Sequence, residues 1–375
     1  MKWALASFAV LLSASCAGLT ALPKPSNPTS DCEDIKSLSS LWECVRTPGL
    51  APKEGGLTST MRVANGDFTR RVLLNQTPSL ACNTNPWSGF EHKSLSAGSA
   101  APLEAFVHEG DANLPVILVI HGLYDSNSNR YVRYVASALA EHGFGVVVPD
   151  MRWHGCLMSL PSTLGITESE DLLAWAEAIR GGKLMRSLRG RPIGMIGFSL
   201  GGLDVIDTIS LDEAAMLFDA GAIAVSPPAD VERVLDRLDH MRTPIAYYFR
   251  ITLRMRNRRL GIPFWTRQPF RKYLDRLIEK HVIPFDSVEK LLNAADPKKR
   301  LTAVRRPLLI IASRNDPVLG RVAADALEKA GKTLYVHVIA TDEGGHIGVI
   351  GRDSQWFVDA MTTFFANAKN VAVRQ

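Results

Sequence analysis

The sequence lacks the short motifs that usually bind a metal ion or nucleotide phosphates. It has no HExxH or CxxC spacing, no dense group of Asp, Glu and His, and neither a Walker A nor a GxGxxG loop. Such patterns supply the ligands of metal sites and the backbone N–H groups that cradle phosphate. We therefore expect neither a metal ion nor a cofactor.

Strong charge of one sign is also missing. The 375 residues are 46% hydrophobic and 22% charged, with a net charge of +5, and no internal repeat or low-complexity block stands out. This composition is typical of a globular protein long enough for one large α/β domain with an insertion. The net charge alone implies no nucleic-acid partner, and the aromatic residues show no spacing typical of a base-stacking platform.

The apolar stretch at the start of the chain, residues 3–12, is too short to span a bilayer. It follows Lys2 and precedes Ser13-Ala14-Ser15-Cys16, which is the order of a signal peptide. Small residues before a cysteine resemble a bacterial lipobox, in which Cys16 becomes the lipidated N-terminus. Because Ala17 follows, we expect an outer-membrane lipoprotein facing the periplasm, anchored by its N-terminal lipid. The alternative is an ordinary signal and a soluble periplasmic or secreted protein.

Residues 1–16 are therefore the predicted signal segment, and residues 17–30, rich in Pro, Ser and Asn, the predicted linker. Cysteine is scarce, with four remaining after Cys16. In an exported protein these can form disulfides. We expect a Cys32–Cys44 bridge. Cys82 and Cys156 would form a second bridge, or Cys156, which follows a core strand, is a buried free thiol; connectivity does not follow from sequence.

Apolar runs alternate with helical patterns from residue 115 onward. Strands are predicted at residues 116–120, 145–149, 192–197, 222–225, 307–316 and 334–340, with shorter candidates at 70–74 and 103–107. Helices are predicted at residues 129–142, 167–179 and 354–367, and from residue 200. This alternation predicts a mostly parallel, doubly wound α/β sheet.

Ser199 lies in Gly197-Phe198-Ser199-Leu200-Gly201, directly after one predicted strand and before a helix. A GxSxG in this setting is the nucleophile elbow of an α/β-hydrolase fold. Asp316 and His346 then follow two later strands, and the order Ser, Asp, His is the order that this fold uses. The alternatives are a turn aspartate and a structural loop histidine, with Asp342 and Glu343 as other candidate acids.

A serine hydroxyl attacks efficiently only when a neighbouring base takes its proton. We expect His346 to be that base and Asp316 to orient its ring. The backbone N–H groups of Leu200 and Leu123 are the predicted oxyanion donors. His121 and residues 150–155 are expected to support the oxyanion loop rather than to transfer protons.

Residues 231–306 interrupt the alternation and are called the insertion below. They hold 19 Lys and Arg against 8 Asp and Glu, and we expect a basic helical cap. A helix over residues 243–261 would carry two stripes. One is apolar, formed by Tyr247, Ile251 and Met255, and the other is basic, formed by Arg250, Arg254 and Arg258. This face is either solvated or a surface for anionic lipid headgroups or an acidic substrate. Residues 31–230 and 307–375 would form the core with an N-terminal extension.

The set of motifs resembles the YheT-like branch of the α/β-hydrolases, also called the AB hydrolase 4 group. The matching segments are His121-Gly122-Leu123, residues 126–130, Arg152 with Gly155-Cys156, residues 197–202, Asn315-Asp316-Pro317 and residues 344–348. The resemblance implies a Ser199, Asp316 and His346 triad, carboxylic ester hydrolysis, and a thiol rather than a bridge at Cys156. Trp153-His154, the basic insertion and the export signal depart from that family.

We therefore expect a serine esterase or lipase-like hydrolase that acts on a small-molecule ester or lipid through an acyl-enzyme. The same three residues would also suit a thioesterase, a peptidase or an acyltransferase. A non-enzymatic binding protein that retains the fold is the alternative from another class.

Overall fold

The computed structural model describes residues 35–46, 82–96, 101–165, 168–240, 249–254, 261–342, 344–350 and 355–371. Several sequence predictions lie outside these ranges, namely the signal segment with Cys16, the linker, Cys32 and the strand at residues 70–74. In the described part of the chain, no helix combines the length and the apolar character that a membrane span requires.

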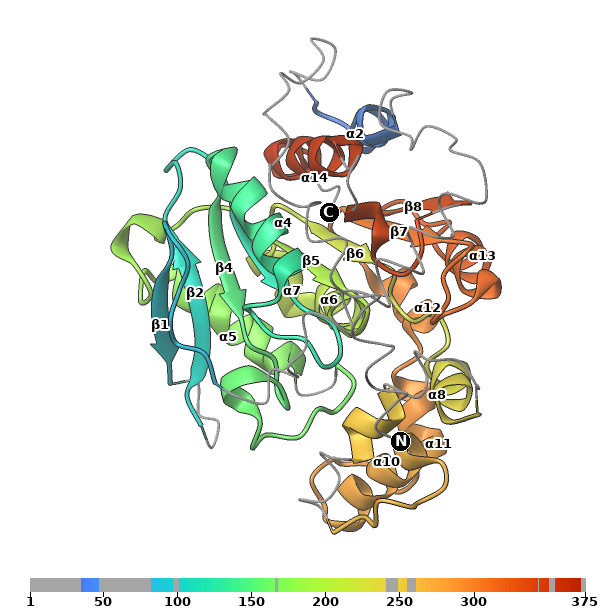
Figure 1. Cartoon of the computed structure of the whole chain (residues 1–375). Helices are drawn as coiled ribbons and strands as arrows, with labels where there is room; N and C mark the ends of the chain where they lie inside the picture. The colour runs from blue at the N-terminus through green and yellow to red at the C-terminus, as the bar shows by residue number, and fades with distance from the viewer. Residues whose placement is uncertain are drawn as a thin grey trace, which may run out of the picture.

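An eight-stranded sheet forms the centre of the molecule, in the order β1-β2-β4-β3-β5-β6-β7-β8 (Figure 1). Its strands are β1 (Glu91–Leu95), β2 (Leu103–His108), β3 (Val116–Ile120), β4 (Gly145–Pro149), β5 (Ile193–Phe198), β6 (Ala222–Val225), β7 (Leu308–Ser313) and β8 (Val336–Thr341). Strand β2 is antiparallel to both β1 and β4, and the other pairs are parallel. The predicted α/β-hydrolase fold class is confirmed.

Continuous apolar sequence produces the central strands. Every residue of β3, β4, β5, β6 and β7 is buried, as expected where helices cover both faces of a parallel sheet. The strands predicted at residues 116–120, 145–149 and 222–225 have the predicted bounds. The other core strands begin within two residues of the prediction.

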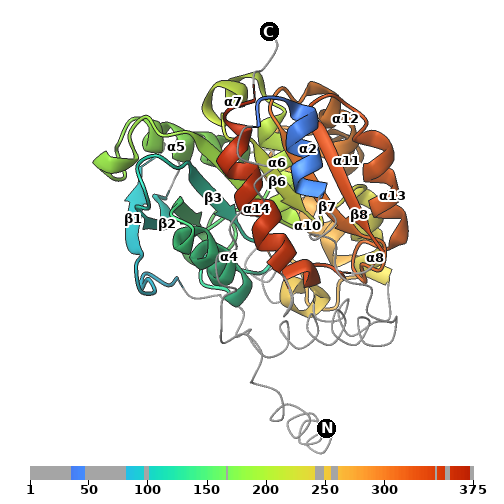
Figure 2. The same cartoon turned by 90° about the horizontal axis from the view of Figure 1, so that it is seen from above.

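Helices cover the sheet in two groups. Helix α4 (Arg130–Glu141) packs against α14 (Gln355–Ala368), which also contacts α2 (Leu38–Arg46). Figure 2 shows this group in front of the strands. Helix α5 (Glu168–Arg180) packs against α6 (Leu200–Ile209) and α7 (Asp212–Leu217), and α13 (Arg321–Ala330) contacts β7 and β8. Short 3-10 turns are η2 (Gly155–Leu157), η3 (Arg186–Leu188), η5 (Leu301–Ala303) and η6 (Gly348–Ile350).

Helix α2 was not among the predicted elements. Its Trp42 stacks on His337 of β8, with ring centroids 5.1 Å apart, and on Phe364 of α14 at 6.2 Å. These contacts place the N-terminal extension against the last strand and last helix of the core. Cys44 in this helix is disulfide-bonded, and its predicted partner, Cys32, lies outside the described residues.

The insertion between β6 and β7 is helical where it is described. It contains α8 (Val231–His240), a helical segment at residues 249–254, α10 (Pro269–Glu279), α11 (Val288–Ala294) and α12 (Pro297–Arg300). Helices α8, α10 and α11 lie together at the lower end of the view in Figure 1.

The predicted faces of the helix at residues 243–261 are wrong where the structure describes it. Arg250 is buried and donates to the backbone oxygen of Asp239 at 2.8 Å, whereas Ile251 is exposed. The physical reason is the spacing of Phe249 and Leu253, which are both buried and turn the intervening arginine inward. Arg258, the last member of the predicted stripe, lies outside the described residues.

Candidate active site

Ser199 occupies a strained turn between β5 and α6. Its φ of 55° and ψ of −115° place a non-glycine residue in a conformation that L-residues rarely adopt. The turn closes tightly because glycine lies on both sides. A Cβ added at Gly197 would come 2.1 Å from the backbone oxygen of Gly201. The local sequence therefore raises Ser199 to the carboxyl edge of the sheet, at the start of a helix.

The structure brings the predicted acid, base and nucleophile together. The Ser199 hydroxyl lies 2.8 Å from Nε2 of His346, and Nδ1 of the same ring lies 2.7 Å from Oδ2 of Asp316. His346 follows β8 and Asp316 follows β7, so parallel pairing of these strands places both side chains at one edge. The alternative acid Asp342 points to solvent with a side chain 87% exposed and pairs with Arg314, and Glu343 lies outside the described residues.

Hydrogen bonds orient the Asp316 carboxylate and determine the tautomer of the His346 ring. The second oxygen of Asp316 accepts the N–H groups of Val318 and Leu319, at 2.7 and 2.9 Å. The ionised carboxylate can therefore accept the Nδ1–H of His346, which leaves the Nε2 lone pair facing the hydroxyl. These distances are those of a nucleophile with its general base.

The loop that carries His346 requires glycine at two positions. A Cβ at Gly344 would come 2.3 Å from the hydroxyl oxygen of Ser313, and Gly345 has a φ of 61°. The N–H of Gly345 donates to the side chain of Asn315 at 2.8 Å. The imidazole therefore sits on a loop that is tied to the end of β7.

The predicted oxyanion donors lie beside Ser199. Leu200 is the first residue of α6, where backbone N–H groups have no acceptor within the helix. The loop after β3 approaches from the other side, because a Cβ at Gly122 would come 3.3 Å from the Ser199 Cβ. The N–H of Gly122 donates to the Tyr131 hydroxyl and that of Tyr124 to His154 Nε2, both at 2.8 Å. Leu123 lies in the sequence between Gly122 and Tyr124, whose N–H groups already donate to these acceptors.

His121 and His154 form hydrogen bonds with the loop after β3, the predicted oxyanion loop, and with the segment after β4. Each ring places Nδ1 against a backbone oxygen, that of Gly122 at 2.9 Å and that of Arg152 at 2.7 Å. Nε2 of His121 accepts the N–H of Met151 at 3.1 Å. Because both Nε2 atoms accept, both rings are neutral. Tyr131 was not predicted, because no motif marks a hydroxyl on a helix that follows the loop.

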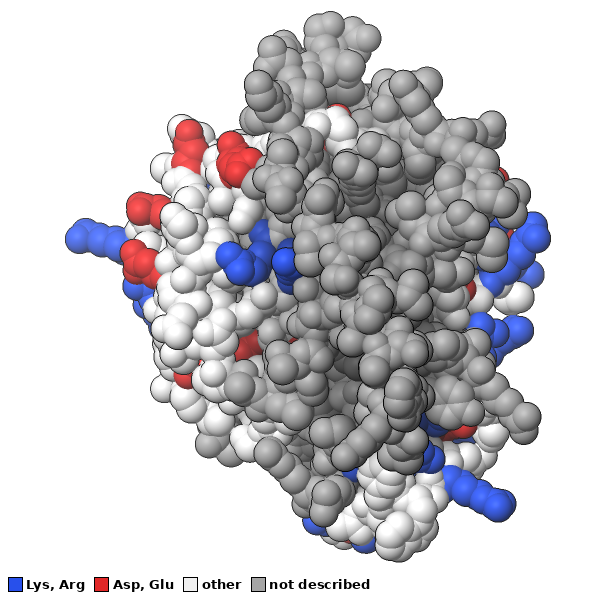
Figure 3. All heavy atoms as spheres, viewed as in Figure 1, with Lys and Arg blue, Asp and Glu red and all other residues white. Residues whose placement is uncertain are grey.

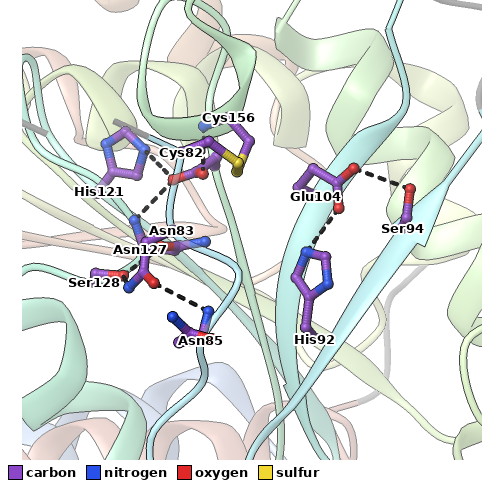
Figure 4. The surroundings of a disulfide bond; sticks show 11 residues. Cys82, Asn83, Asn85, His92, Ser94, Glu104, His121, Asn127, Ser128 and Cys156 are labelled. Atoms are coloured by element: carbon purple, nitrogen blue, oxygen red, sulfur yellow. Dashed lines mark hydrogen bonds and ion pairs between the residues drawn. A yellow bond between two sulfur atoms is a disulfide. The ribbon is translucent and has the colours of Figure 1, made fainter. Parts of the chain in front are cut away.

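Asp150 connects the oxyanion loop to a disulfide. Its carboxylate accepts the N–H groups of Asn127 and Cys156, at 3.0 and 2.9 Å (Figure 4). Burial raises the Asp150 pKa to about 6, although these two donors act in the opposite direction. Cys156 is bonded to Cys82. The thiol that the family resemblance implied at Cys156 is therefore wrong, and the bridge left open by the residues alone is present.

Two further carboxyls are buried in α6 behind Ser199. Burial raises the pKa of Asp204 well above its ordinary value and that of Asp207 to about 8. Nε of Arg300, from the insertion, lies 2.9 Å from Asp207 and lowers the pKa only in part. These groups were not predicted, because a short run of α6 residues does not reveal that its polar positions face inward.

An apolar pocket of about 710 Å³, counting its opening to solvent, lies directly over Ser199. The core contributes Leu123, Trp153, Leu200 and Leu203 to its wall, and no charged side chain of the described residues lines it. The insertion contributes the opposite wall, including Val231, Leu235, Leu238, Phe249, Phe270 and Tyr273. Trp153 stacks on Tyr273 with ring centroids 4.4 Å apart, which joins the two walls.

Residues 117–360 match the alpha/beta hydrolase family, and the chain belongs to it. It is 24% identical over 298 residues to the medium-chain fatty acid ethyl ester synthase/esterase 2 of Saccharomyces cerevisiae, covering 70% of this chain and 64% of that protein. It is 22% identical to the monoacylglycerol lipase of the same yeast, covering 70% of this chain and 61% of the lipase. The chain thus spans less than two thirds of the length of either relative.

Among solved structures, an esterase from Pyrococcus furiosus has the same fold, with a TM-score of 0.54 and 17% identity. The match covers 76% of this chain and 96% of the esterase. This similarity concerns the fold alone.

The raised pKa of Asp207 predicts a pH-dependent stability. The folded protein keeps the proton on Asp207 between pH 3.8 and about 8, where the unfolded chain releases it. The free energy of unfolding should therefore fall as pH rises through this range. In Asp207→Asn that fall should be smaller, so the variant gains stability relative to wild type at pH 8 compared with pH 5. Urea denaturation at both pH values measures this, with the exposed Asp212→Asn as control. If the free energy of unfolding fell equally between pH 5 and pH 8 in Asp207→Asn and in wild type, burial of Asp207 would not be the cause of the fall.

Proposed function

We propose that the protein is a serine hydrolase that cleaves carboxylic esters of apolar acids. The observation that carries this proposal is the hydrogen-bonded chain from Ser199 through His346 to Asp316, at the floor of an apolar pocket. A binding module would gain nothing from a buried imidazole held between a hydroxyl and a carboxylate.

The mechanism follows from these positions. His346 Nε2 takes the hydroxyl proton as the Ser199 oxygen attacks the ester carbonyl carbon, and the carbonyl oxygen becomes negative. The N–H groups of Leu200 and Leu123 stabilise that charge. The tetrahedral intermediate then expels the alcohol, which takes the proton from His346 and leaves an acyl-enzyme. A water molecule, deprotonated by the same imidazole, releases the acid and restores Ser199.

Asp316 acts by holding the imidazole in the correct tautomer and by stabilising its charged form. Asp316 accepts hydrogen bonds from two backbone N–H groups, and these keep its carboxylate oriented while the charge on the His346 ring changes. The strained φ of Ser199 is retained through the cycle, since the glycine contacts that impose it lie outside the reacting atoms.

The pocket wall indicates the substrate class. Aliphatic and aromatic side chains line the space next to Ser199, which suits an acyl chain rather than a charged group. The names of both yeast relatives, an ethyl ester synthase/esterase and a monoacylglycerol lipase, also describe proteins that act on fatty acyl esters. We therefore propose that the substrate is a fatty acyl ester of either a small alcohol or a lipid alcohol.

Ser199→Ala should lower the kcat for p-nitrophenyl ester hydrolysis by about 10⁴-fold or more, because the nucleophile is lost while the pocket remains. Ser226→Ala is the matched control: Ser226 also follows a core strand with a positive φ, but lies outside the pocket. Circular dichroism should show both variants folded. Wild type alone should be labelled at residue 199 by a fluorophosphonate. A fully active Ser199→Ala would refute the assignment, and an unlabelled, inactive wild type would favour a non-enzymatic binding protein.

Acyl transfer is the second candidate, because one relative is named a synthase as well as an esterase and the pocket is apolar. An alcohol can replace water in attacking the acyl-enzyme, and the proton balance is the same. With added ethanol we expect free acid as the main product at low alcohol and a growing share of ethyl ester as ethanol rises. Ethyl ester exceeding acid even at low ethanol would make transfer the principal activity. An acyl thioester in the same assay tests the thioesterase alternative.

We also propose that the protein is an exported lipoprotein of the YheT-like branch. The support is the order of Lys2, the apolar stretch and Cys16, together with the motif set. Cells fed radiolabelled palmitate should label wild type and Ser13→Ala but not Cys16→Ser. Label that persists in Cys16→Ser would exclude lipidation at this cysteine, and a phylogenetic tree that separates the chain from YheT-like proteins would exclude the branch.

A further inference from the structure

Large apolar side chains are exposed on the insertion. Trp265 is 82% exposed, Phe264 47% and Ile251 46%. Single exposed apolar residues are common, but a group of them marks an interaction surface. Trp265 leaves nearly its whole indole in water, although burial of such a ring stabilises a protein more than burial of most side chains.

These three residues belong to one region of the surface. The guanidinium of Arg254 lies 5.7 Å from the centre of the Phe264 ring, and its Nη2 donates to the backbone oxygen of Thr266 at 3.4 Å. Arg254 therefore joins the helical segment at residues 249–254, which carries Ile251, to the segment that carries Phe264 and Trp265. We call Ile251, Arg254, Phe264, Trp265 and Arg267 the insertion tip.

The insertion tip lies on the outer side of the pocket wall. Phe249, two residues before Ile251, lines the pocket, and so does Phe270, the second residue of α10. The same two segments thus present one apolar side chain to the pocket and others to solvent. None of the five tip residues lines the pocket.

The charge of the insertion tip is not compensated locally. Arg254 and Arg267 form no ion pair within the described residues, whereas Arg271 and Arg276 of α10 pair with Glu289 and Glu279. The sequence on either side of residues 249–254 adds only positive charge. Residues 241–248 and 255–260 contain no acid and four arginines, Arg242, Arg256, Arg258 and Arg259. Figure 3 shows Lys and Arg side chains projecting at the lower edge of the molecule, where the insertion lies.

We propose that the insertion tip docks the protein onto an anionic lipid bilayer. Trp and Phe are the side chains that partition into the headgroup region, and arginines beside them bind lipid phosphates while their alkyl stems stay in apolar surroundings. Arginines near an anionic membrane surface are attracted by its negative potential. Docking at this place sets the pocket wall against the membrane surface, from which an acyl ester can enter. The surface is independent of the chemistry at Ser199.

Vesicle sedimentation of the full chain carrying Cys16→Ser, which prevents lipid attachment there, tests the proposal. Binding to vesicles of equal phosphatidylcholine and phosphatidylglycerol should exceed binding to phosphatidylcholine alone by about tenfold or more. Phe264→Ser with Trp265→Ser should lower the partition coefficient on the mixed vesicles by about tenfold. Arg254→Gln with Arg267→Gln should lower it to the level seen with phosphatidylcholine.

Matched controls come from exposed residues elsewhere. Met216→Ser with Leu334→Ser removes exposed apolar side chains outside the insertion, and Lys183→Gln removes an exposed positive charge; both should bind as the parent chain does. All variants should hydrolyse a water-soluble ester at the parent rate without vesicles, which separates failure of docking from failure of the proposed hydrolysis. Measuring binding in Ser199→Ala gives the same separation.

Three outcomes would overturn the proposal. Tip variants that bind like the parent would show that other residues hold the membrane. Equal binding to both kinds of vesicle would remove the role of the arginines. Binding to soluble polyglutamate that depends on the tip, without vesicle binding, would assign the surface to an acidic protein instead.

Discussion

The close contact between Gly197 and Gly201 is the constraint on which the site depends. With only hydrogen at both Cα atoms, β5 can turn directly into α6, and the backbone at Ser199 is forced to positive φ. The hydroxyl then projects beyond the sheet edge while the following N–H groups point to the same space. A side chain at Gly197 would collide with the backbone of Gly201, and one at Gly201 would collide with the backbone of Ile120 and His121 at the end of β3. The strain at Ser199 persists because ten buried residues of α6 anchor the turn from the other side.

Buried polar groups around this turn are of two kinds. The oxyanion loop is held by neutral imidazoles and by Tyr131, so its orientation does not depend on a charge. The carboxyl groups in α6 are different, since burial keeps their protonated forms favoured.

The sequence was informative where local patterns determine the structure. The apolar runs of β3, β4 and β6 end at glycine, proline or a polar residue, and each strand has the bounds predicted from its run. The order of Ser199, Asp316 and His346 along the chain was also enough to predict that they lie close together, because parallel strands place their carboxyl ends at one edge of the sheet. Strand β1, by contrast, has no alternating pattern and exists by pairing with β2. Helix α2 depends on the contact of Trp42 with rings that are distant in sequence. The burial of Arg250 depends on which side of its helix faces the core. A short stretch of sequence predicts neither.

The bridge between Cys82 and Cys156 joins two distant parts of the chain close to the loop beside Ser199. It links residues 74 apart, and Cys156 is one hydrogen bond from Asp150, whose carboxylate also fixes Asn127 in the loop beside Ser199. The bridge therefore attaches residue 82, which precedes β1, to the hydrogen bonds that hold the loop after β3. Reduction of the bridge would release residue 82 from this part of the fold and leave Ser199, Asp316 and His346 in the chain.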